Sequence, residues 1–306
     1  MRDSFISELT ELAQKNSNII LITGDLGFGV LDEYIRTVPN QFLNAGVAEQ
    51  NMTGIATGLA LEGKTVFTYS IGNFNTLRCL EQIRNDACYH NANVNIVSVG
   101  GGFSYGPLGY SHHATEDIAI MRSIPNMRVF APSSSWEVKK IVQKMVNLDG
   151  VNYLRIDKSS APSIESSKSK LEIGKSRIIK DGTDIAIFSC GGILELAMKA
   201  RELLKNEGIS VRVISMHTIK PFDEKIVIEC AKQIPAILTL EEHAVSGGLG
   251  SIICETLIKN KIVPNNFQMM GLESKFSTIV GSQDYLREIN NIGLKSIIEN
   301  VRKLTS

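Results

Sequence analysis

The alternation of strand-like and helix-like segments constrains the fold of this chain more than any other feature of its sequence. In the first half, short apolar runs rich in β-branched residues alternate with longer segments whose apolar residues recur at helical spacing. The expected strands are 18–23, 41–44, 64–69, 94–99 and 127–131. The expected helices begin at Val47, span 76–88 and begin again at Ser135, with Ser133 or Ser134 as N-cap. Strands that alternate with helices predict a mostly parallel sheet that helices cover on both faces.

A second alternating run follows a segment of different composition. Residues 157–175 are rich in Ser, Lys and Glu, and Pro162 interrupts them, which is typical of a linker. The second run predicts, in chain order, strand 184–189, helix 193–206, strand 211–215, helix 226–231, strand 236–241 and helix 248–258. The sequence therefore predicts two α/β domains, residues 1–165 and 166–306, with residues 302–306 as a frayed tail.

Charge and length narrow the classes of function. The 306 residues include 32 basic and 32 acidic side chains, so the formal net charge is zero. Proteins that bind nucleic acids or membrane surfaces normally carry a basic patch, and no apolar run here approaches the ~20 residues of a membrane span. The chain starts in an amphipathic helix with acidic residues, unlike a secretory signal, and its five cysteines form no CxxC pair. We therefore expect a cytoplasmic protein with reduced thiols that binds neither nucleic acid nor membrane.

One carboxylate stands out because the helix that follows it carries no other charge. Glu49 comes after the short strand 41–44 and leads into residues 53–61, which are all small or apolar. Burial of an unpaired carboxylate is costly, so a glutamate in this position must be paired, protonated or used in chemistry. Glu49 is therefore the first candidate catalytic residue.

Two glycine-rich segments look like phosphate-binding loops but lack the required spacing. Residues 24–29 follow a strand, and residues 247–250 follow Glu241, Glu242 and His243. Neither segment has the GxGxxG pattern that opens directly into a helix. We expect a structural turn at the first segment and close packing of a helix against a strand at the second.

A long loop, residues 100–115, begins at the carboxyl end of an expected strand, where parallel sheets place their ligand sites. It contains His112 and His113. Adjacent histidines can shuttle protons near neutral pH, or bind a metal for which Glu116 and Asp117 are weak further ligands. Alternatively, the cluster caps the next helix through Ser111 or Thr115. The residue pattern leaves these alternatives open.

With these residues identified, the chain resembles the transketolase family of thiamine-diphosphate enzymes, over nearly its whole length but only for the C-terminal half of a full transketolase. Residues 44–52 resemble the segment with the family's catalytic glutamate, and residues 69–84 resemble its pyrimidine-binding strand and helix. Residues 109–113 are similar to the Gly-Pro-Thr-His-Gln motif, which aligns His112 with the family histidine. Residues 220–223, 241–250 and 276–286 are similar to the C-terminal domain of deoxyxylulose-phosphate synthase. The resemblance implies a pyrimidine-binding domain followed by a transketolase C-terminal α/β domain.

The family binds diphosphate and magnesium through a separate N-terminal domain, with Gly-Asp-Gly and a downstream Asn. This chain offers only Gly24-Asp25-Leu26 and is expected to supply no metal ligand itself. The resemblance therefore implies one subunit of a split enzyme, whose partner is an N-terminal transketolase subunit that holds thiamine diphosphate with magnesium or calcium. Because sites of this family lie between subunits, the resemblance also implies a self-dimer within a heterotetramer.

The resemblance assigns roles to five residues. Glu49 would hydrogen-bond N1′ of the cofactor's aminopyrimidine ring and favour the tautomer that takes the C2 proton of the thiazolium. His112 would polarise the substrate carbonyl or protonate the developing alkoxide, with assistance from His113. Phe74 is expected to stack on the pyrimidine, unless it is a core aromatic. Arg78 lies where the family has an aromatic near the ring, so a cofactor contact and a surface or interface role are both open.

The substrate is less constrained. Arg155 and Lys158 resemble family residues that hold a sugar phosphate, but a lysine lacks the bidentate grip of an arginine. The chain has Leu108, Gly100 and Ala131 where the family has an acidic residue, a histidine and an arginine, respectively. These departures imply an unusual sugar or a donor that is bound differently.

The expected activity is transfer of a two-carbon ketol unit from a ketose or ketose phosphate to an aldose. The alternatives are the beta subunit of a 2-oxo-acid dehydrogenase, a synthase of the deoxyxylulose-phosphate type, and a binding protein that kept the fold.

Overall fold

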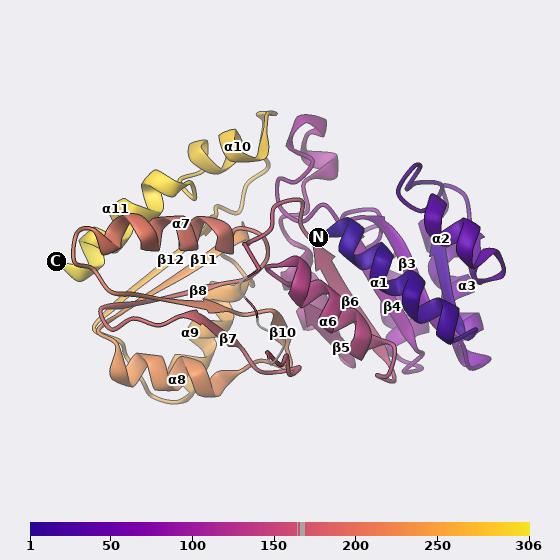
Figure 1. Ribbon diagram of the computed structural model, residues 1–306, viewed down its shortest axis with the longest axis horizontal. Coiled ribbons are helices and arrows are strands. Elements are labelled where there is room, and N and C mark those ends of the chain that lie inside the picture. Colours follow the sequence, from indigo (N-terminus) through magenta and orange to yellow (C-terminus); the bar gives the residue numbers. More distant parts are fainter. Residues whose placement is uncertain (164, 166–168) are drawn as a thin grey trace.

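The two alternating runs of the sequence form two sheets, one in each half of the chain. The computed structural model describes residues 1–163, 165 and 169–306. Within these ranges the sheets and their helices lie side by side along the longest axis of the molecule (Figure 1). The predicted α/β class with a mostly parallel sheet is confirmed.

The first sheet has seven strands in the order β10-β5-β6-β4-β3-β1-β2. Neighbouring strands are parallel, except that β10 runs antiparallel to β5. The strands are β1 (Ile19–Thr23), β2 (Phe42–Asn44), β3 (Thr65–Ile71), β4 (Val94–Val99), β5 (Met127–Phe130), β6 (Val151–Ile156) and β10 (Thr218–Lys220). All residues of β4 and β6 are buried, as expected for central strands of a parallel sheet with two covered faces.

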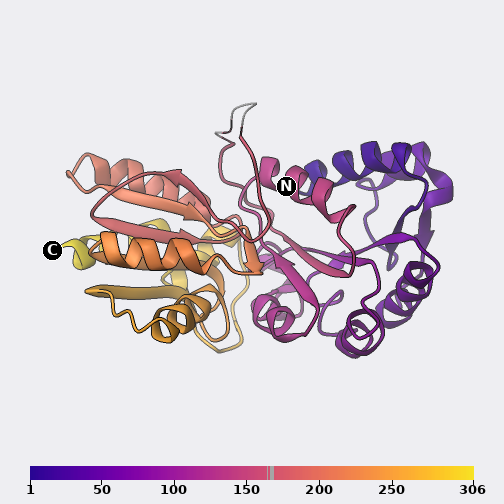
Figure 2. The same ribbon diagram turned by 90° about the horizontal axis from the view of Figure 1, so that it is seen from below.

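Helices cover both faces of the first sheet, as Figure 2 shows. Helices α1 and α6 pack together on one face, and α3, α5 and a π-helical segment pack on the other. The helical segments of this half are α1 (Arg2–Lys15), α2 (Asp32–Thr37), α3 (Glu49–Leu61), α4 (Leu80–Gln82), the π-helix η2 (Ile83–Cys88), α5 (Asp117–Ser123) and α6 (Ser135–Met145). Three short 3-10 turns are η1 (Pro39–Gln41), η3 (Gly106–Leu108) and η4 (Tyr110–His112).

The second sheet has five strands in the order β12-β11-β8-β9-β7, parallel except for β7 beside β9. Its strands are β7 (Arg177–Lys180), β8 (Ile185–Ser189), β9 (Val211–Ser215), β11 (Ala236–Ala244) and β12 (Asn266–Leu272). Its helices are α7 (Leu194–Lys205), α8 (Glu224–Gln233), α9 (Leu249–Lys259), α10 (Gln283–Ile289) and α11 (Leu294–Thr305). Helices α7 and α11 cover one face, and α8 and α9 cover the other. The apolar core under α8 and α9 is continuous with the core under α3 and α5.

Several element boundaries differ from the expectation. Helix α3 begins at Glu49 rather than Val47, because Gly46 adopts a positive φ of 73° and the chain turns into the helix only after Ala48. The predicted helix 76–88 begins at Leu80. The residues before it are held in turns by the buried Asn75 side chain, which donates to the carbonyls of Thr68 and Val97. The expected frayed tail is also wrong, because α11 continues to Thr305 and Arg302 pairs with Glu207.

Local sequence signals were correct elsewhere. Ser134 is the N-cap of α6, and its hydroxyl accepts a hydrogen bond from the backbone N–H of Glu137. Residues 24–29 form a turn, and Gly250 lets α9 approach Thr239 and Met269 closely. No described helix combines the length and apolar character needed to cross a bilayer. The predicted boundary between residues 165 and 166 adjoins positions outside the described ranges, and residue 166 is one of them, so it stays a prediction.

Candidate active site

The carboxyl ends of the parallel strands bring the candidate residues to one edge of the first sheet. In the sheet register, Thr23 of β1 lies beside Asn44 of β2 and Tyr69 of β3. The segments that leave these ends carry Glu49 after β2, Phe74 and Arg78 after β3, and both histidines after β4. Ligand sites of open parallel sheets lie at this edge.

Glu49 is buried at the first position of α3. Its side chain is only 2% exposed, and Arg78 Nη1 lies 2.6 Å from its Oε2 atom. Gly24 packs against it so closely that a Cβ atom at position 24 would lie 3.3 Å from Glu49 Cγ. Of the alternatives that the sequence left open for this carboxylate, the structure therefore shows the paired one.

A row of side chains in contact extends from Glu49 through Arg78 and Phe74 to His112. The guanidinium carbon of Arg78 lies 4.5 Å from the centre of the Phe74 ring. The His112 ring meets Phe74 edge-on, with 5.2 Å between ring centres. Partial burial, and to a lesser degree the neighbouring His113, lowers the pKa of His112. The imidazole is consequently neutral at neutral pH and can accept a proton.

His113 points away from this row and is buried. Its Nε2 atom lies 3.1 Å from the carbonyl oxygen of Gly106, and its ring meets Phe103 edge-on. The histidine loop is held by Asn73, whose amide donates to the carbonyls of Tyr110, Ser111 and His113. The two histidines therefore face different surroundings, and His112 is the more accessible one.

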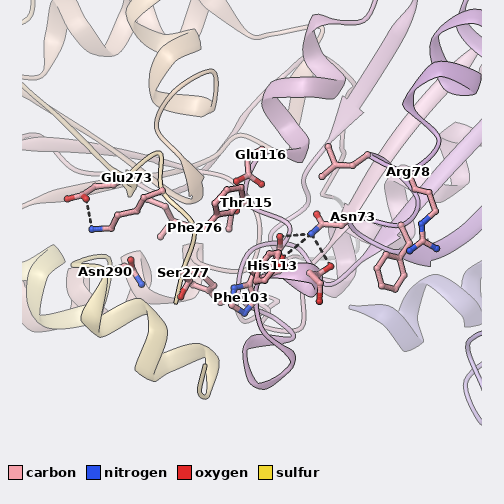
Figure 3. Close-up of a pocket in the computed structure, with 16 residues that line it drawn as sticks. Asn73, Arg78, Phe103, His113, Thr115, Glu116, Glu273, Phe276, Ser277 and Asn290 are labelled. Atoms are coloured by element: carbon pink, nitrogen blue, oxygen red, sulfur yellow. Dashed lines mark hydrogen bonds and ion pairs between the residues drawn. The ribbon is translucent and has the colours of Figure 1, made fainter. Parts of the chain in front are cut away.

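A pocket of about 340 Å³ opens beside the row, between the two halves of the chain. Phe74, Arg78 and His113 line it from the first half. Phe276, Ser277 and Asn290 line it from the second half (Figure 3). Its wall mixes aromatic rings with hydroxyl, amide and charged groups, which suits a polar ligand such as a sugar.

The two candidates for phosphate binding differ sharply in exposure. Arg155 is 1% exposed, and its Nε atom lies 3.2 Å from Asp117 Oδ2 and 3.7 Å from Asp157 Oδ1. The expectation that Arg155 holds a substrate phosphate is therefore corrected, because two aspartates already neutralise it in the interior. Lys158 is exposed, with its ammonium 5.9 Å from the centre of the Tyr105 ring, which in turn lies beside His112.

The Arg155 pairs belong to a larger buried charge cluster between the two sheets. Burial lowers the pKa of Arg155, but Asp117 and Asp157 outweigh it and raise the pKa overall. Glu242, at the end of β11, is paired with Arg287 and accepts hydrogen bonds from Gln283 and from the backbone N–H of Phe103. These contacts fasten the start of the loop 100–115 to the second half of the chain.

The remaining charged residues of this region serve the packing of α9 and α5. Both carboxylate oxygens of Glu241 accept backbone N–H groups at the start of α9, from Leu249 and Gly250. His243 is fully buried, and burial lowers its pKa. Its Nδ1 atom bonds the carbonyl of Ala244, and its Nε2 atom accepts the N–H of Ala119, so the ring is held neutral.

Two alternatives for the histidine loop are not supported. The predicted helix cap by Ser111 or Thr115 is wrong, because α5 begins at Asp117 and its N-cap is Glu116, with no side-chain cap. The Asp117 carboxylate accepts the hydroxyl of Tyr153 rather than facing the histidines. Among the described residues, no three His, Cys, Asp or Glu side chains are grouped so that they could hold a metal ion.

The family relationship follows from two matches that span most of the chain. Residues 1–163 match the family model "Transketolase, pyrimidine binding domain", and residues 174–272 match "Transketolase, C-terminal domain". The chain belongs to the transketolase family. It corresponds to the subunit of a split transketolase that carries these two domains, as expected from residues 44–52 and 109–113.

Two of the chain's curated relatives are transketolase subunits. It is 36% identical over 263 residues to an apulose-4-phosphate transketolase subunit of Phocaeicola vulgatus, covering 85% of this chain and 84% of that protein. It is 33% identical over 306 residues to the 6-deoxy-6-sulfo-D-fructose transketolase subunit SqwH of Clostridium sp. strain MSTE9, covering 100% and 94%. A solved split-gene transketolase, described as an inactive beta4 tetramer, superimposes with a TM-score of 0.90 at 33% identity and covers 99% and 97% of the two chains.

Transketolase membership implies thiamine diphosphate as cofactor. The residues present fit its aminopyrimidine half, because a buried carboxylate and an aromatic face lie next to each other at the ligand edge of the sheet. They offer no comparable grouping for a metal among the described residues.

Three residues of this transketolase site were not anticipated. Asn73 organises the histidine loop, Phe103 supports His113, and Phe276 forms part of the pocket from the second half of the chain. The position of Asn73, two residues after the carboxyl end of β3, is a usable signal for the first of them. No local motif signals the other two: Phe103 contacts His113 within the same loop, and the ring partner of Phe276 is the distant Tyr110.

Proposed function

We propose that this chain is the pyrimidine-binding subunit of a two-chain transketolase that transfers a two-carbon ketol unit from a ketose to an aldose. The observation that carries the proposal is the buried Glu49 carboxylate at the start of α3, which Arg78 connects to the Phe74 ring, with His112 against the same ring. When bound, thiamine diphosphate supplies a nucleophilic carbon and an electron sink for cleavage of the ketose.

The site residues of the chain have different roles in the proposed reaction. Glu49 would hydrogen-bond N1′ of the aminopyrimidine when the cofactor is bound, and Phe74 would offer its face to the ring. His112, neutral near pH 7 because burial lowers its pKa, moves the proton of the substrate oxygen. His113 supports the loop from its bond to Gly106 and can assist His112. Lys158 is the proposed contact for an anionic group on the sugar, since it is exposed near Tyr105 and His112.

The proposal requires a partner. An N-terminal transketolase subunit would hold the diphosphate group with magnesium or calcium, and two copies of each chain would form a heterotetramer in the cytoplasm. The relative described as a beta4 tetramer and as inactive supports self-association of such a chain and a need for the missing half. The curated relatives act on a phosphorylated and a sulfonated sugar by their names, which supports an anionic ketose as donor.

The alternatives of an oxo-acid dehydrogenase beta subunit and a deoxyxylulose-phosphate type synthase are weaker, because both of these curated relatives are transketolase subunits. Either alternative would release carbon dioxide from a 2-oxo acid, whereas ketol transfer releases none. A donor screen with carbon dioxide detection on the reconstituted complex separates the reactions.

The decisive test is Glu49→Gln in the complex with the partner chain. We expect loss of about 100-fold or more in the rate of hydrogen–deuterium exchange at C2 of bound thiamine diphosphate, because the variant cannot share the N1′ proton. Glu62→Gln, at the exposed end of the same helix, is the matched control and should leave the rate unchanged. Exchange at the wild-type rate in Glu49→Gln would refute the role of Glu49.

A further inference from the structure

The Arg78 guanidinium makes two contacts that an aminopyrimidine ring would need. It donates to Glu49 Oε2 at 2.6 Å, and it lies 4.5 Å above the Phe74 ring (Figure 3 shows Arg78 at the edge of the pocket). A guanidinium and an aminopyrimidine are both flat groups that pair N–H donors with a carboxylate and stack on an aromatic face.

We infer that Arg78 is a displaceable plug of the cofactor site: its guanidinium takes the place of the aminopyrimidine ring and must swing away from Glu49 and Phe74 when the cofactor binds. The inference rests on the proposed function of Glu49 and Phe74 and adds a regulatory residue to that site. It predicts that the chain binds its cofactor more weakly than the same site would with a shorter side chain at position 78.

The surroundings of Arg78 allow this movement. Its side chain is 43% exposed, whereas its partner Glu49 is 2% exposed. Within residues 1–163, 165 and 169–306, its one ion pair is the one with Glu49. Arg78 also borders the 340 Å³ pocket, so the long side chain has space to enter. The carboxylate is fixed and the cation is free to leave.

The ion pair between Arg78 and Glu49 also stabilises the isolated subunit. A buried carboxylate without a partner is costly, and Arg78 supplies that partner until a ligand takes over. The apparent affinity for the cofactor is reduced by the fraction of molecules in which Arg78 is docked, so any contact that draws Arg78 outward raises cofactor affinity.

Cofactor affinity tests the plug directly. We would measure the dissociation constant of thiamine diphosphate by equilibrium dialysis on the complex with the partner chain, for wild type, Arg78→Ala and Arg78→Gln. We expect both variants to bind about 3- to 10-fold more tightly, as expected for loss of one partly exposed ion pair that competes with the ligand. Arg84→Ala, an exposed arginine 6 residues along the chain, is the control and should not change the affinity. Unchanged or weaker binding in both Arg78 variants would overturn the plug.

Chemical labelling gives a second, independent readout in the wild-type complex. Phenylglyoxal modifies free guanidinium groups, and peptide mass spectrometry reports Arg78 and Arg84 separately. A displaced Arg78 should be labelled faster when thiamine diphosphate is present, with Arg84 unchanged. Protection of Arg78 by the cofactor would mean that the arginine holds the ligand, and would refute the plug.

Glu49→Ala distinguishes this failure from failure of the proposed function. If Glu49→Ala abolishes C2 exchange while the Arg78 variants bind normally, the proposed function stands and the plug falls. If Glu49→Ala leaves C2 exchange intact, the proposed function itself falls.

Discussion

Among the described ion pairs between a buried carboxylate and an arginine, the pairs of two regions differ most in the exposure of the arginine. At the ligand edge of the first sheet, Glu49 is 2% exposed and Arg78 is 43% exposed. Between the sheets, Glu242 and Arg287 are 1% and 2% exposed. The first pair can exchange its cation for a ligand, whereas the second cannot open without unfolding part of the protein. Exposure of the cation, rather than burial of the acid, separates a working site from a structural one.

The bonds around each arginine show the same difference. Arg287 contacts Glu242 through Nε and Nη2 and also donates to Ser159. Arg155 pairs with Asp117 and donates to the carbonyls of Ala114 and Glu242. The Arg78 guanidinium makes one hydrogen bond and one ring contact to the residues that the structure describes. Three predictions on stability and one on titration test the contrast.

The largest effect is expected for Arg155→Met, which leaves the buried Asp117 and Asp157 without their shared cation. Removal of one partner from a buried ion pair costs about 3–5 kcal/mol, and two acids are affected here. We expect a loss of at least the upper part of that range in the free energy of unfolding, measured with urea. Arg302→Met, which breaks an exposed pair with Glu207, is the control and should change the free energy of unfolding far less, because water screens an exposed pair. A similar small loss in Arg155→Met would contradict the structural role of the cluster.

A smaller loss, of about 3 kcal/mol near pH 7, is expected for Arg287→Met, because Glu242 keeps its hydrogen bonds from Phe103 and Gln283. Burial raises the pKa of Glu242, and Arg287 opposes this rise. The variant therefore raises the folded-state pKa further above the unfolded value. Such a group stabilises the fold below its unfolded pKa and loses that contribution as the pH rises through the folded pKa.

The destabilisation by Arg287→Met should consequently be larger at pH 8 than at pH 5 in matched urea titrations. A loss that is constant across this pH range would show that Glu242 does not carry the effect.

A still smaller change is expected for Arg78→Met, because water can enter the exposed site and solvate Glu49. We expect a loss in the free energy of unfolding clearly below that of Arg287→Met, because the arginine of this pair is already 43% exposed. Together with tighter cofactor binding, this result would distinguish the exchangeable pair of Arg78 and Glu49 from the buried pairs of Arg287 and Arg155. A loss comparable with that of Arg287→Met would erase the contrast between the two regions.

The smallest expected effects are on the titration of two histidines, His112 at the ligand edge and His243 in the buried charge cluster. Burial lowers the pKa of both His112 and His243, but only His112 reaches solvent. In proton NMR titrations between pH 5 and 8, the His112 ring should titrate with a midpoint below 6.5, and the His243 ring should stay neutral throughout. Replacement of His113 by Gln should raise the His112 midpoint, because His113 contributes to the lowered pKa of His112. Ordinary titration of His243 would contradict its fixed hydrogen bonds.

The sequence predicts the ligand edge well, because its signals are local. Strand ends, the charge-free helix after Glu49 and the histidine loop are all contiguous, and a parallel sheet brings them together. The buried cluster is different. Asp157 lies only two positions from Arg155, but Asp117 and Glu242 are 38 and 87 positions away along the chain (117 to 155 and 155 to 242), so the sequence near Arg155 reveals only part of its pairing.

The same reason explains the remaining errors. The start of the predicted helix 76–88 was displaced to Leu80 by Asn75, whose bonds reach back to β3 and across to β4. Phe276 reaches the pocket from a segment that no motif of the first half indicates. Tertiary contacts between distant segments decided each of these cases.

Strand β10 connects the two domains, because it belongs to one family domain by sequence and to the sheet of the other by pairing. Residues Thr218–Lys220 lie within the C-terminal family domain, yet they pair with β5 and complete the first sheet. An excised pyrimidine-binding domain would therefore lack a piece of its own sheet and present bare backbone groups to other chains, a known route to aggregation. Division of the chain between its two halves would leave the first sheet without β10 and leave β10 without its partner strand β5.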